Sequence, residues 1–294
     1  MSRHIALIGA PTSAGAFAPG QEDAPAALRE AGLTEALGAT DRGDVPRFRW
    51  RVDHDEPRAM NAAAVVDGVR AVAARVEEAL HAGERPLVLG GDCTVGVGTV
   101  AGAVAAGAQP RLVYLDLHAD LNTPASVPDG ALDWMGVAHM LDLDGADDRL
   151  AGAGPRRPLL VDADLVLLGI GPDQATKHER ATVAQRALQP IGVDQLLADP
   201  EAAAHRALDR ATANGRRFLV HFDVDVIDFS DVPLSENTGR GIGVPFDTAL
   251  AALDVLLAHD ALLGCTVTEL NPHHGAPDGS DVARLAQRLA AALR

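Results

Sequence analysis

Two apolar segments of the chain end in polar side chains that could do chemistry together. In the first, Asp116, His118 and Asp120 alternate with apolar residues, and in the second Asp223 and Asp225 do the same. Side chains alternate between the two faces of a strand, so each segment directs its polar residues to one side. Buried carboxylates without a counter-charge repel one another and are costly. Because neither segment contains Lys or Arg, the pattern predicts bound divalent metal ions.

The ligand types indicate two cations rather than one. Four Asp and one His offer enough donors for two ions bridged by carboxylate, and imidazole among carboxylates favours Mn, with Fe, Co or Zn as alternatives. Two such ions can share a water and make it acidic near neutral pH, which is hydrolase chemistry. A single Asp-x-Asp would be an ordinary strand end, whereas two clusters that each close an apolar strand favour a binuclear centre.

Two further strand ends add candidate residues. Gly90 and Gly91 permit a tight turn before Cys93, which opens a helix whose positive N-terminus would favour a thiolate. Taken alone, Cys93 would be a small core residue, and Cys265, on a strand of its own, keeps that interpretation. Glu269 ends a fourth strand, where its carboxylate could hold a guanidinium in bidentate fashion.

The elements that position these residues alternate along the chain. Short runs rich in Val, Leu and Ile predict strands at residues 5–9, 86–90, 112–116, 165–169, 218–223 and 265–269. Helical spacing of apolar residues predicts helices at 61–82, 201–214, 246–259 and 278–293. This alternation predicts a doubly wound, three-layer α/β/α fold with a mostly parallel sheet, as a single domain over residues 1–294. Sites in such folds form at the carboxyl ends of strands, so the loops at 14–25, 122–133 and 230–245 are expected to be site walls.

Composition narrows the classes of partner and compartment. The 294 residues are 47% hydrophobic and carry a formal net charge of −16, with 25 Lys and Arg against 41 Asp and Glu. That balance argues against nucleic acid or an anionic membrane as partner, because both need clustered basic residues. Two cysteines cannot build a disulfide framework, and neither a signal peptide nor a membrane span is visible, so a cytoplasmic location is expected.

On these motifs the sequence resembles the ureohydrolase family, which includes arginase, agmatinase, guanidinobutyrase and formimidoylglutamase. Five stretches look like the family's N-terminal, Gly-Gly-Asp-His, Asp-Ala-His-x-Asp, Asp-x-Asp-x-x-Asp and Glu-x-Asn-Pro motifs. In chain order they lie at residues 8–29, 90–93, 116–124, 223–228 and 269–272. The resemblance covers most of the chain and implies an arginase-like fold, two Mn ions and a homo-oligomer, either trimer or hexamer.

The resemblance also implies roles for individual residues. Asp116 and Asp223 would bridge the two metals, Asp120 and Cys93 would complete one of them, and the other would be completed by His118 and Asp225. Asp120 would hydrogen-bond the metal-bridging hydroxide, and Glu269 would hold the substrate guanidinium. Attack of the hydroxide on the guanidinium carbon would release urea and an amine. The implied substrate is a small cationic guanidino compound, with arginine or a close relative first.

The sequence departs from the family at a metal ligand. Cys93 stands where the family has a ligand histidine. A thiolate is a softer ligand that shifts preference towards Zn, Co or Fe. Either Cys93 binds the metal and retunes the site, or that metal is weak or missing. Because the other five predicted ligands are intact, ligation is the favoured reading.

Two further departures concern the proton shuttle and the substrate tail. Trp134 or Met135 stands where the family has a histidine that passes a proton to the leaving amine, and His139, one helical turn later, could substitute. Other candidates for this role are His221, His273 and His274. Asn122 matches an arginase residue that contacts the substrate α-carboxylate. The arginase serine further along that loop falls near Asp129 in this sequence. The resemblance therefore does not establish that the substrate carries an α-amino acid tail.

Without the shuttle, a guanidine with a less basic leaving nitrogen, such as N-hydroxy-arginine, would be easier to hydrolyse. Agmatine and guanidino acids are further candidate substrates. The alternative function is a degenerate family member that binds a ligand or partner without turnover. A deacetylase on a related fold fits less well, because such sites use one Zn and histidine pairs that this sequence lacks.

Overall fold

The segments predicted as strands lie side by side in one sheet. The structure is a computed structural model and describes residues 4–294. Six strands form the centre of the sheet: β1 (Ile5–Gly9), β3 (Arg85–Leu89), β4 (Arg111–Leu115), β5 (Leu165–Ile170), β7 (Phe218–Asp223) and β8 (Leu262–Thr268). Each overlaps a predicted run of Val, Leu and Ile that is buried on both faces, as strands covered by two helical layers must be.

Two short edge strands complete the sheet and escape the sequence analysis. β2 (Thr40–Asp44) pairs with β1, and β6 (Ile191–Gly192) pairs with β5. The β2 sequence, Thr-Asp-Arg-Gly-Asp, is largely exposed, so it lacks the apolar run that marks the central strands. The strand order is β2-β1-β3-β8-β7-β4-β5-β6, with every pairing parallel. The prediction of a mostly parallel α/β sheet is therefore confirmed.

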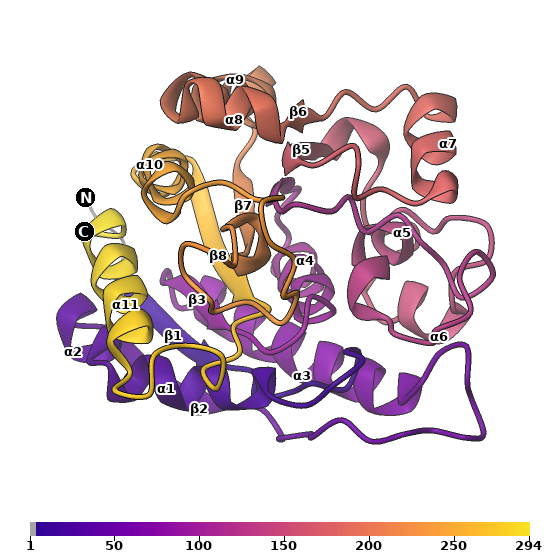
Figure 1. The fold of residues 1–294 in the computed structure, drawn as a ribbon, viewed down its shortest axis with the longest axis horizontal. Helices are drawn as coiled ribbons and strands as arrows, with labels where there is room; N and C mark the ends of the chain where they lie inside the picture. The colour runs from indigo at the N-terminus through magenta and orange to yellow at the C-terminus, as the bar shows by residue number, and fades with distance from the viewer. Residues whose placement is uncertain (1–3) are drawn as a thin grey trace.

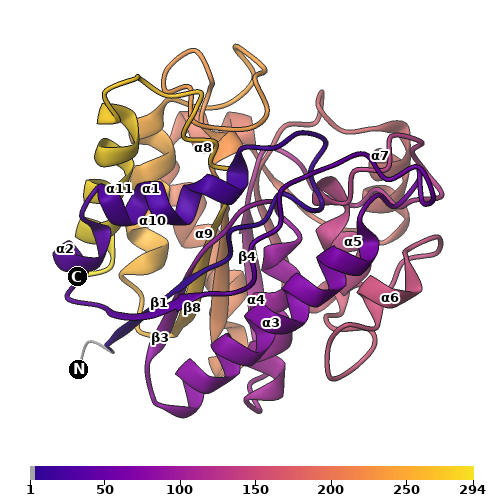
Figure 2. The same cartoon turned by 90° about the horizontal axis from the view of Figure 1, so that it is seen from below.

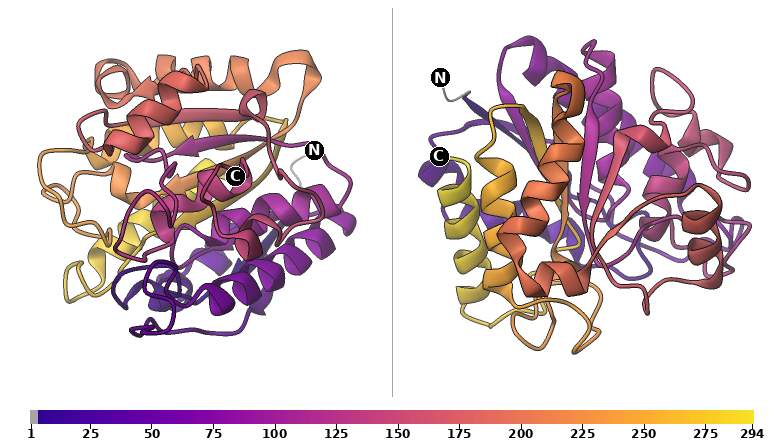
Figure 3. Two further views of the ribbon diagram at one scale, coloured as in Figure 1. Left: turned by 90° about the vertical axis from the view of Figure 1, so that its right-hand side faces the viewer. Right: turned by 90° about the horizontal axis from the view of Figure 1, so that it is seen from above.

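Helices cover both faces of this sheet (Figures 1 and 2). One face carries α1 (Ala24–Glu30), α2 (Leu33–Leu37), α8 (Val193–Ala198), α9 (Pro200–Thr212), α10 (Phe246–Leu257) and α11 (Ser280–Ala292), which share one buried cluster with the strands. The opposite face carries α3 (Ala62–His81), α4 (Val95–Ala105), α5 (Gly136–Met140), α6 (Asp148–Ala151) and α7 (Lys177–Gln185). Figure 3 shows α9, α10 and α11 packed beside one another.

The four predicted helices agree with α3, α9, α10 and α11 to within a few residues at each end. Each has an apolar stripe facing the sheet and a polar outer face. In contrast, α4 reads Val-Gly-Val-Gly-Thr-Val-Ala-Gly-Ala-Val-Ala and is buried almost all round, so it has no amphipathic period to detect. Among residues 4–294, no helix is long and apolar enough to cross a bilayer.

Glycines in α4 let it approach α3 closely. A Cβ atom at Gly98 would lie 2.7 Å from the Val69 carbonyl oxygen, and one at Gly102 would lie 2.4 Å from that of Ala73. Both oxygens belong to the α3 backbone, which cannot move aside as a side chain could. The close contact fixes α4, and with it the turn after β3, against the rest of the molecule.

The last strand in the sequence occupies the middle of the sheet. β8 lies between β3 and β7, and β7 is followed by β4. The carboxyl ends of these four neighbouring strands open at the same edge, which is where ligands bind in open α/β sheets. These ends carry the four groups of residues that the sequence singled out.

Candidate metal centre

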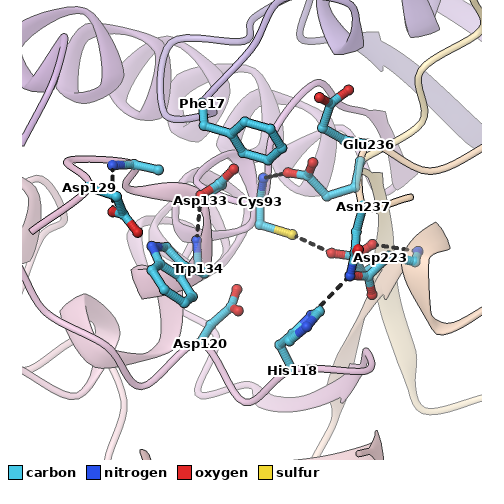
Figure 4. A pocket seen from close by; sticks show the side chains of 13 residues that line it. Phe17, Cys93, His118, Asp120, Asp129, Asp133, Trp134, Asp223, Glu236 and Asn237 are labelled. Carbon is cyan, nitrogen blue, oxygen red and sulfur yellow. Dashed lines mark hydrogen bonds and ion pairs between the residues drawn. The ribbon is translucent and has the colours of Figure 1, made fainter. Parts of the chain in front are cut away.

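A cavity of about 450 Å³ lies at the carboxyl ends of β3, β8, β7 and β4 (Figure 4). Its lining is Phe17, Cys93, His118, Asp120, Asp129, Ala131, Asp133, Trp134, Asp223, Asp225, Glu236, Asn237 and Glu269. Each of the three loops predicted as site walls contributes, with Phe17 from the first, Asp129 from the second and Glu236 from the third. The cavity is therefore framed by the strand ends below and by these loops above.

One group of potential metal ligands gathers around Cys93. Donor atoms of Cys93, Asp116, His221 and Asp223 all lie within 4.8 Å of one another, and all four residues are buried. Cys93 Sγ is 2.9 Å from Asp223 Oδ2, to which it donates, and 3.2 Å from His221 Nε2. Figure 4 shows the sulfur directed at Asp223. Three strands deliver this group, because Asp116 follows β4 and Cys93 follows β3.

A second group shares one residue with the first. It consists of Asp116, His118 and Asp225. His118 Nδ1 lies 2.9 Å from Asp225 Oδ2 and 3.6 Å from Asp116 Oδ1. The Asp225 carboxylate also accepts from Asn237 Nδ2 at 3.3 Å. Asp116 thus stands between two sets of donors, as a bridging carboxylate would.

The buried carboxyl groups of this cluster would be stabilised by additional positive charge. Burial raises the pKa of Asp116 to about 7, with the nearby Asp225 charge adding to the effect. Burial also raises the pKa of Asp223 well above its usual value, again with Asp225 contributing. Asp225 differs: burial alone would raise its pKa, but the His118 imidazolium, together with hydrogen bonds from Asn237 and the Leu117 N–H, lowers it. Among the described residues, His118 is thus the cationic partner of Asp116 and Asp225, and no ion pair supplies positive charge to Asp223.

A buried oxygen without a partner supports a cation at this place. In the described part of the chain, Asp116 Oδ2 is buried and accepts no hydrogen bond. A buried acceptor left unsatisfied costs about 1–3 kcal/mol, more when it is charged. Two clusters of oxygen, nitrogen and sulfur donors around such an atom fit divalent transition-metal ions. The residues present are therefore suited to hold two cations.

Cys93 does not have the lowered pKa that a helix N-terminus alone would give. Burial raises the pKa of its thiol well above the usual value, and the charges of Asp223 and Glu269 raise it further. The sequence led us to expect that the start of helix α4 would favour a thiolate at Cys93. Without a bound cation that expectation is wrong, because desolvation and the surrounding carboxylates outweigh the helix dipole. A bound cation would reverse that balance, since a coordinating thiol is deprotonated outright.

Glu269 lies directly after β8 with a positive φ of 60°, an uncommon conformation for a residue other than glycine. Its carboxylate accepts from the Cys93 backbone N–H at 2.7 Å and from Gln21 Nε2 at 3.1 Å. Burial raises its pKa well above the usual value, with help from the Asp133 charge. Glu269 is thus a buried carboxyl group beside the metal cluster that still lines the cavity.

Asp120 also has a positive φ, of 50°, and lines the cavity. Its carboxylate accepts a hydrogen bond from the Tyr114 hydroxyl on β4. It belongs to neither group of clustered donor atoms. The structure therefore places it at the cavity wall, where its carboxyl group is oriented by a tyrosine.

Two predicted residues lie away from the cavity lining. His139, in α5, is buried, with Nδ1 2.7 Å from the Met135 carbonyl oxygen and Nε2 accepting from the Asp147 N–H at 3.0 Å. Asn122 is also buried, and its Oδ1 accepts from Thr176 Oγ1 at 2.8 Å. Neither is among the residues that line the cavity. Of the other histidines, His273 pairs with Asp23 at the surface, and His274 contacts Ser235 O.

The structure adds Gln21 and Tyr114 to the site, and it brings His221, which the sequence offered as a proton-shuttle candidate, into a group of potential ligands. Gln21 contacts Glu269, Tyr114 orients Asp120, and His221 joins the Cys93 group. His221 and Tyr114 had a signal, since alternation along a strand places them on the same faces as Asp223 and Asp116. Gln21 reaches Glu269 by packing between distant segments, which no local pattern encodes.

Fold and site together define a doubly wound α/β protein with a carboxylate-rich candidate metal centre at its strand ends. A model described as "Arginase family" matches residues 3–293, and the chain belongs to that family of hydrolases. It is similar to an arginase of Agrobacterium fabrum, 29% identical over 300 residues that cover 98% of this chain and 89% of the relative. It is also 28% identical to human arginase-1 over 282 residues, covering 93% and 87% of the two chains.

Solved structures show the same fold. The arginase from Bacillus caldovelox superimposes with a TM-score of 0.86 at 22% identity, covering 99% of this chain and 98% of that one. The proclavaminate amidino hydrolase from Streptomyces clavuligerus gives a TM-score of 0.70 at 20% identity, with coverage of 99% and 91%. These structures confirm the predicted α/β fold class, and the family match over residues 3–293 confirms the resemblance to ureohydrolases.

Proposed function

We propose that this protein is a binuclear metal-dependent hydrolase that cleaves a guanidino compound into urea and an amine. The observation that carries the proposal is the pair of donor groups that share Asp116 beneath a cavity containing Glu269. Mn is the first choice of metal, with Zn, Co and Fe open because of Cys93. Homotrimer or hexamer assembly and a cytoplasmic location stay predictions.

The chain's own residues would hold the two cations. Asp116, His118 and Asp225 form one position, and Cys93 with Asp223 contributes to the other. When bound, the two cations would supply Lewis acidity and a water acidic enough to act as a nucleophile near neutral pH.

Glu269 is proposed to bind the guanidinium. Its carboxylate is fixed by the Cys93 N–H and by Gln21, so its remaining lone pairs face the cavity that it lines. A guanidinium and a carboxylate form two parallel charge-assisted hydrogen bonds, which would orient the guanidinium carbon towards the metal cluster. Addition of water at that carbon and cleavage of its bond to the alkyl nitrogen gives urea and an amine.

Asp120 is proposed to handle the proton of the attacking water. The Tyr114 hydroxyl holds its carboxylate at the cavity wall, and burial raises the pKa of Asp120 well above its usual value. A carboxyl group so placed can accept a proton and release it towards the leaving amine. The shuttle role of His139 and the binding role of Asn122 stay predictions.

The charge of the cavity favours a substrate with a cationic tail. Apart from Asp120 and the candidate ligands Asp223 and Asp225, four carboxyl residues line the cavity: Asp129, Asp133, Glu236 and Glu269. Within residues 4–294, its lining includes no Lys or Arg to receive a substrate carboxylate. Burial raises the pKa of Asp129, Asp133 and Glu236, so each would gain from a positive neighbour.

Among the candidate substrates, agmatine therefore fits the outer cavity best. It carries an amine where a guanidino acid carries a carboxylate, and arginine, which carries both, lies between them. Unit charges 4 Å apart interact by about 4 kcal/mol in a partly screened environment, so the difference between an attractive and a repulsive tail is large. N-hydroxy-arginine tests separately whether a less basic leaving nitrogen makes hydrolysis faster.

Urea release from agmatine, L-arginine, N-hydroxy-arginine and guanidinobutyrate, measured with Mn-loaded and Co-loaded protein, tests this function. We expect urea from at least one compound, and a kcat/KM that is higher for agmatine than for guanidinobutyrate. The reverse order would contradict the assignment of the tail. No urea from any of the four, with two metal ions bound per chain, would favour the alternative of a degenerate member that binds without turnover.

A further inference from the structure

His221 lies at the metal cluster although the sequence gives it no role as a ligand. It precedes Asp223 by two residues on β7, so both side chains point to the same face of the strand. Its Nε2 atom is 3.2 Å from Cys93 Sγ and 3.0 Å from Thr268 Oγ1. The imidazole therefore stands among the same donors as the thiol.

The surroundings hold this ring in one orientation. Tyr114, the partner of His221 on β4, stacks on it with ring centroids 4.1 Å apart and planes 8° from parallel. On α4, a Cβ atom at Gly96 would lie 2.5 Å from His221 Nδ1, so only glycine leaves room for the ring. The stacking and the glycine together direct Nε2 towards Cys93.

A cation among these donors is indicated by a separate observation. Asp116 belongs to the same group of four, and its buried Oδ2 has no hydrogen-bond partner within the described residues. By contrast, Asp120, which the family resemblance assigns to this metal, is outside the group and is hydrogen-bonded by Tyr114.

Cys93 stands where the family has a ligand histidine, so the imidazole of that histidine is missing from this position. We propose that His221 supplies an imidazole in its place, so that one metal position is formed by Cys93, His221, Asp116 and Asp223. The inference rests on the proposed function only in requiring bound divalent cations. With this ligand set, the two metal positions differ in the elements that bind the ion. The position with sulfur and nitrogen donors prefers Zn or Co, whereas the position with His118, Asp116 and Asp225 is richer in oxygen and suits Mn.

Cobalt(II) is the probe, because a thiolate bound to it gives a sulfur-to-metal charge-transfer band in the near ultraviolet and an imidazole alters its visible d–d bands. Metal-free protein is titrated with Co(II) alone. For the wild-type chain we expect the charge-transfer band with the first equivalent. Cys93→Ser is expected to abolish this band, and Cys265→Ser, a change at the other buried cysteine, is expected to leave it intact.

The decisive variants are at His221. His221→Gln is expected to keep the charge-transfer band, shift the d–d bands and weaken Co(II) binding at least about tenfold. His221→Cys is expected to raise the intensity of the charge-transfer band about twofold, because two thiolates would then bind. A purely structural histidine would not produce this gain. Asp120→Asn is expected to leave the wild-type spectrum unchanged.

The outcomes separate this inference from the proposed function. Unchanged Co(II) spectra and affinity in both His221 variants, with circular dichroism showing folded protein, would overturn the ligand assignment and leave the hydrolase proposal standing. Conversely, the expected spectra together with no urea from any guanidino substrate would support the ligand assignment and overturn the hydrolase. Absence of Co(II) binding by the wild-type protein would overturn both.

Discussion

Cys93 is the residue on which the character of the metal centre depends. Its sulfur is within hydrogen-bonding distance of Asp223, His221 and Thr268, so it is surrounded by polar partners rather than by the aliphatic side chains usual for a core cysteine. Cys265, by comparison, has one long contact to a backbone carbonyl, at 3.7 Å. The two cysteines offer a natural pair of test and control.

Replacing Cys93 by His is expected to raise the affinity for Mn(II) and lower that for Co(II). Imidazole is a harder ligand than thiolate, and Mn(II) favours harder donors. Isothermal titration of the metal-free protein with each ion measures both changes, with Cys265→Ser as the matched control. Equal stoichiometry and affinity in wild type and Cys93→His would show that the sulfur does not bind metal.

Replacing Glu269 by Gln is expected to reduce kcat/KM for a guanidino substrate by about 10- to 100-fold, since a charged hydrogen bond contributes about 1.5–3 kcal/mol. The fold should tolerate the change. The amide oxygen can still accept from Cys93 N–H, and rotation of Gln21 would present its Oε1, which has no hydrogen-bond partner among the described residues. Steady-state urea release measures the effect, and a wild-type rate with an unchanged KM would exclude Glu269 from guanidinium binding.

Residue types and spacing predicted much of the site. Asp116, His118, Asp223 and Asp225 lie together as the alternation of strand residues requires. The roles of Asp120 and His221 were harder to foresee because both depend on Tyr114, whose hydroxyl contacts one and whose ring stacks on the other. The stacking of Tyr114 on His221 joins β4 to β7, so it depends on the order of the sheet, which the sequence does not show locally.

At the scale of elements, prediction succeeded where one physical signal dominated. The central strands are buried on both faces and read as apolar runs, and α3 and α11 have a clear amphipathic period. The edge strand β2 is polar because one side is open to solvent, and α4 is apolar all round because it is enclosed. Neither shows the pattern by which its type of element is usually found.

The packing of α4 on α3 can be tested with a pair of glycine substitutions. Gly102→Ala is expected to destabilise the protein by about 1–3 kcal/mol, because its methyl group would meet the α3 backbone. Gly68→Ala, within α3, has no atom within 4 Å of the new Cβ and is expected to stabilise by up to about 1 kcal/mol. Urea unfolding followed by circular dichroism compares them. Equal effects at the two positions would contradict the close packing.

For the whole molecule, metal binding is expected to contribute to stability. Ions that bind only the folded chain stabilise it by about 2.7 kcal/mol at a concentration 100 times the Kd. For a chain of this length, that corresponds to a rise in Tm of about 4 °C for each ion bound. Melting is measured after chelation and again after Mn(II) or Co(II) is restored.

The carboxylates that repel one another without a cation give the reason for this effect. Asp223→Asn, which removes one of them, should melt higher than wild type in chelator and respond less to added ion. A Tm that does not change on chelation in wild type would be inconsistent with a metal centre in this cluster.

The central place of β8 has a consequence for biosynthesis. Until residues 262–268 leave the ribosome, the sheet can exist only as two separate parts, β2-β1-β3 and β7-β4-β5-β6. Cys93 belongs to the first part, and Asp116 and Asp223 belong to the second. A nascent chain therefore lacks the metal position that combines Cys93 with Asp116 and Asp223, and loading of that position from the cellular metal pool must await the final stage of translation.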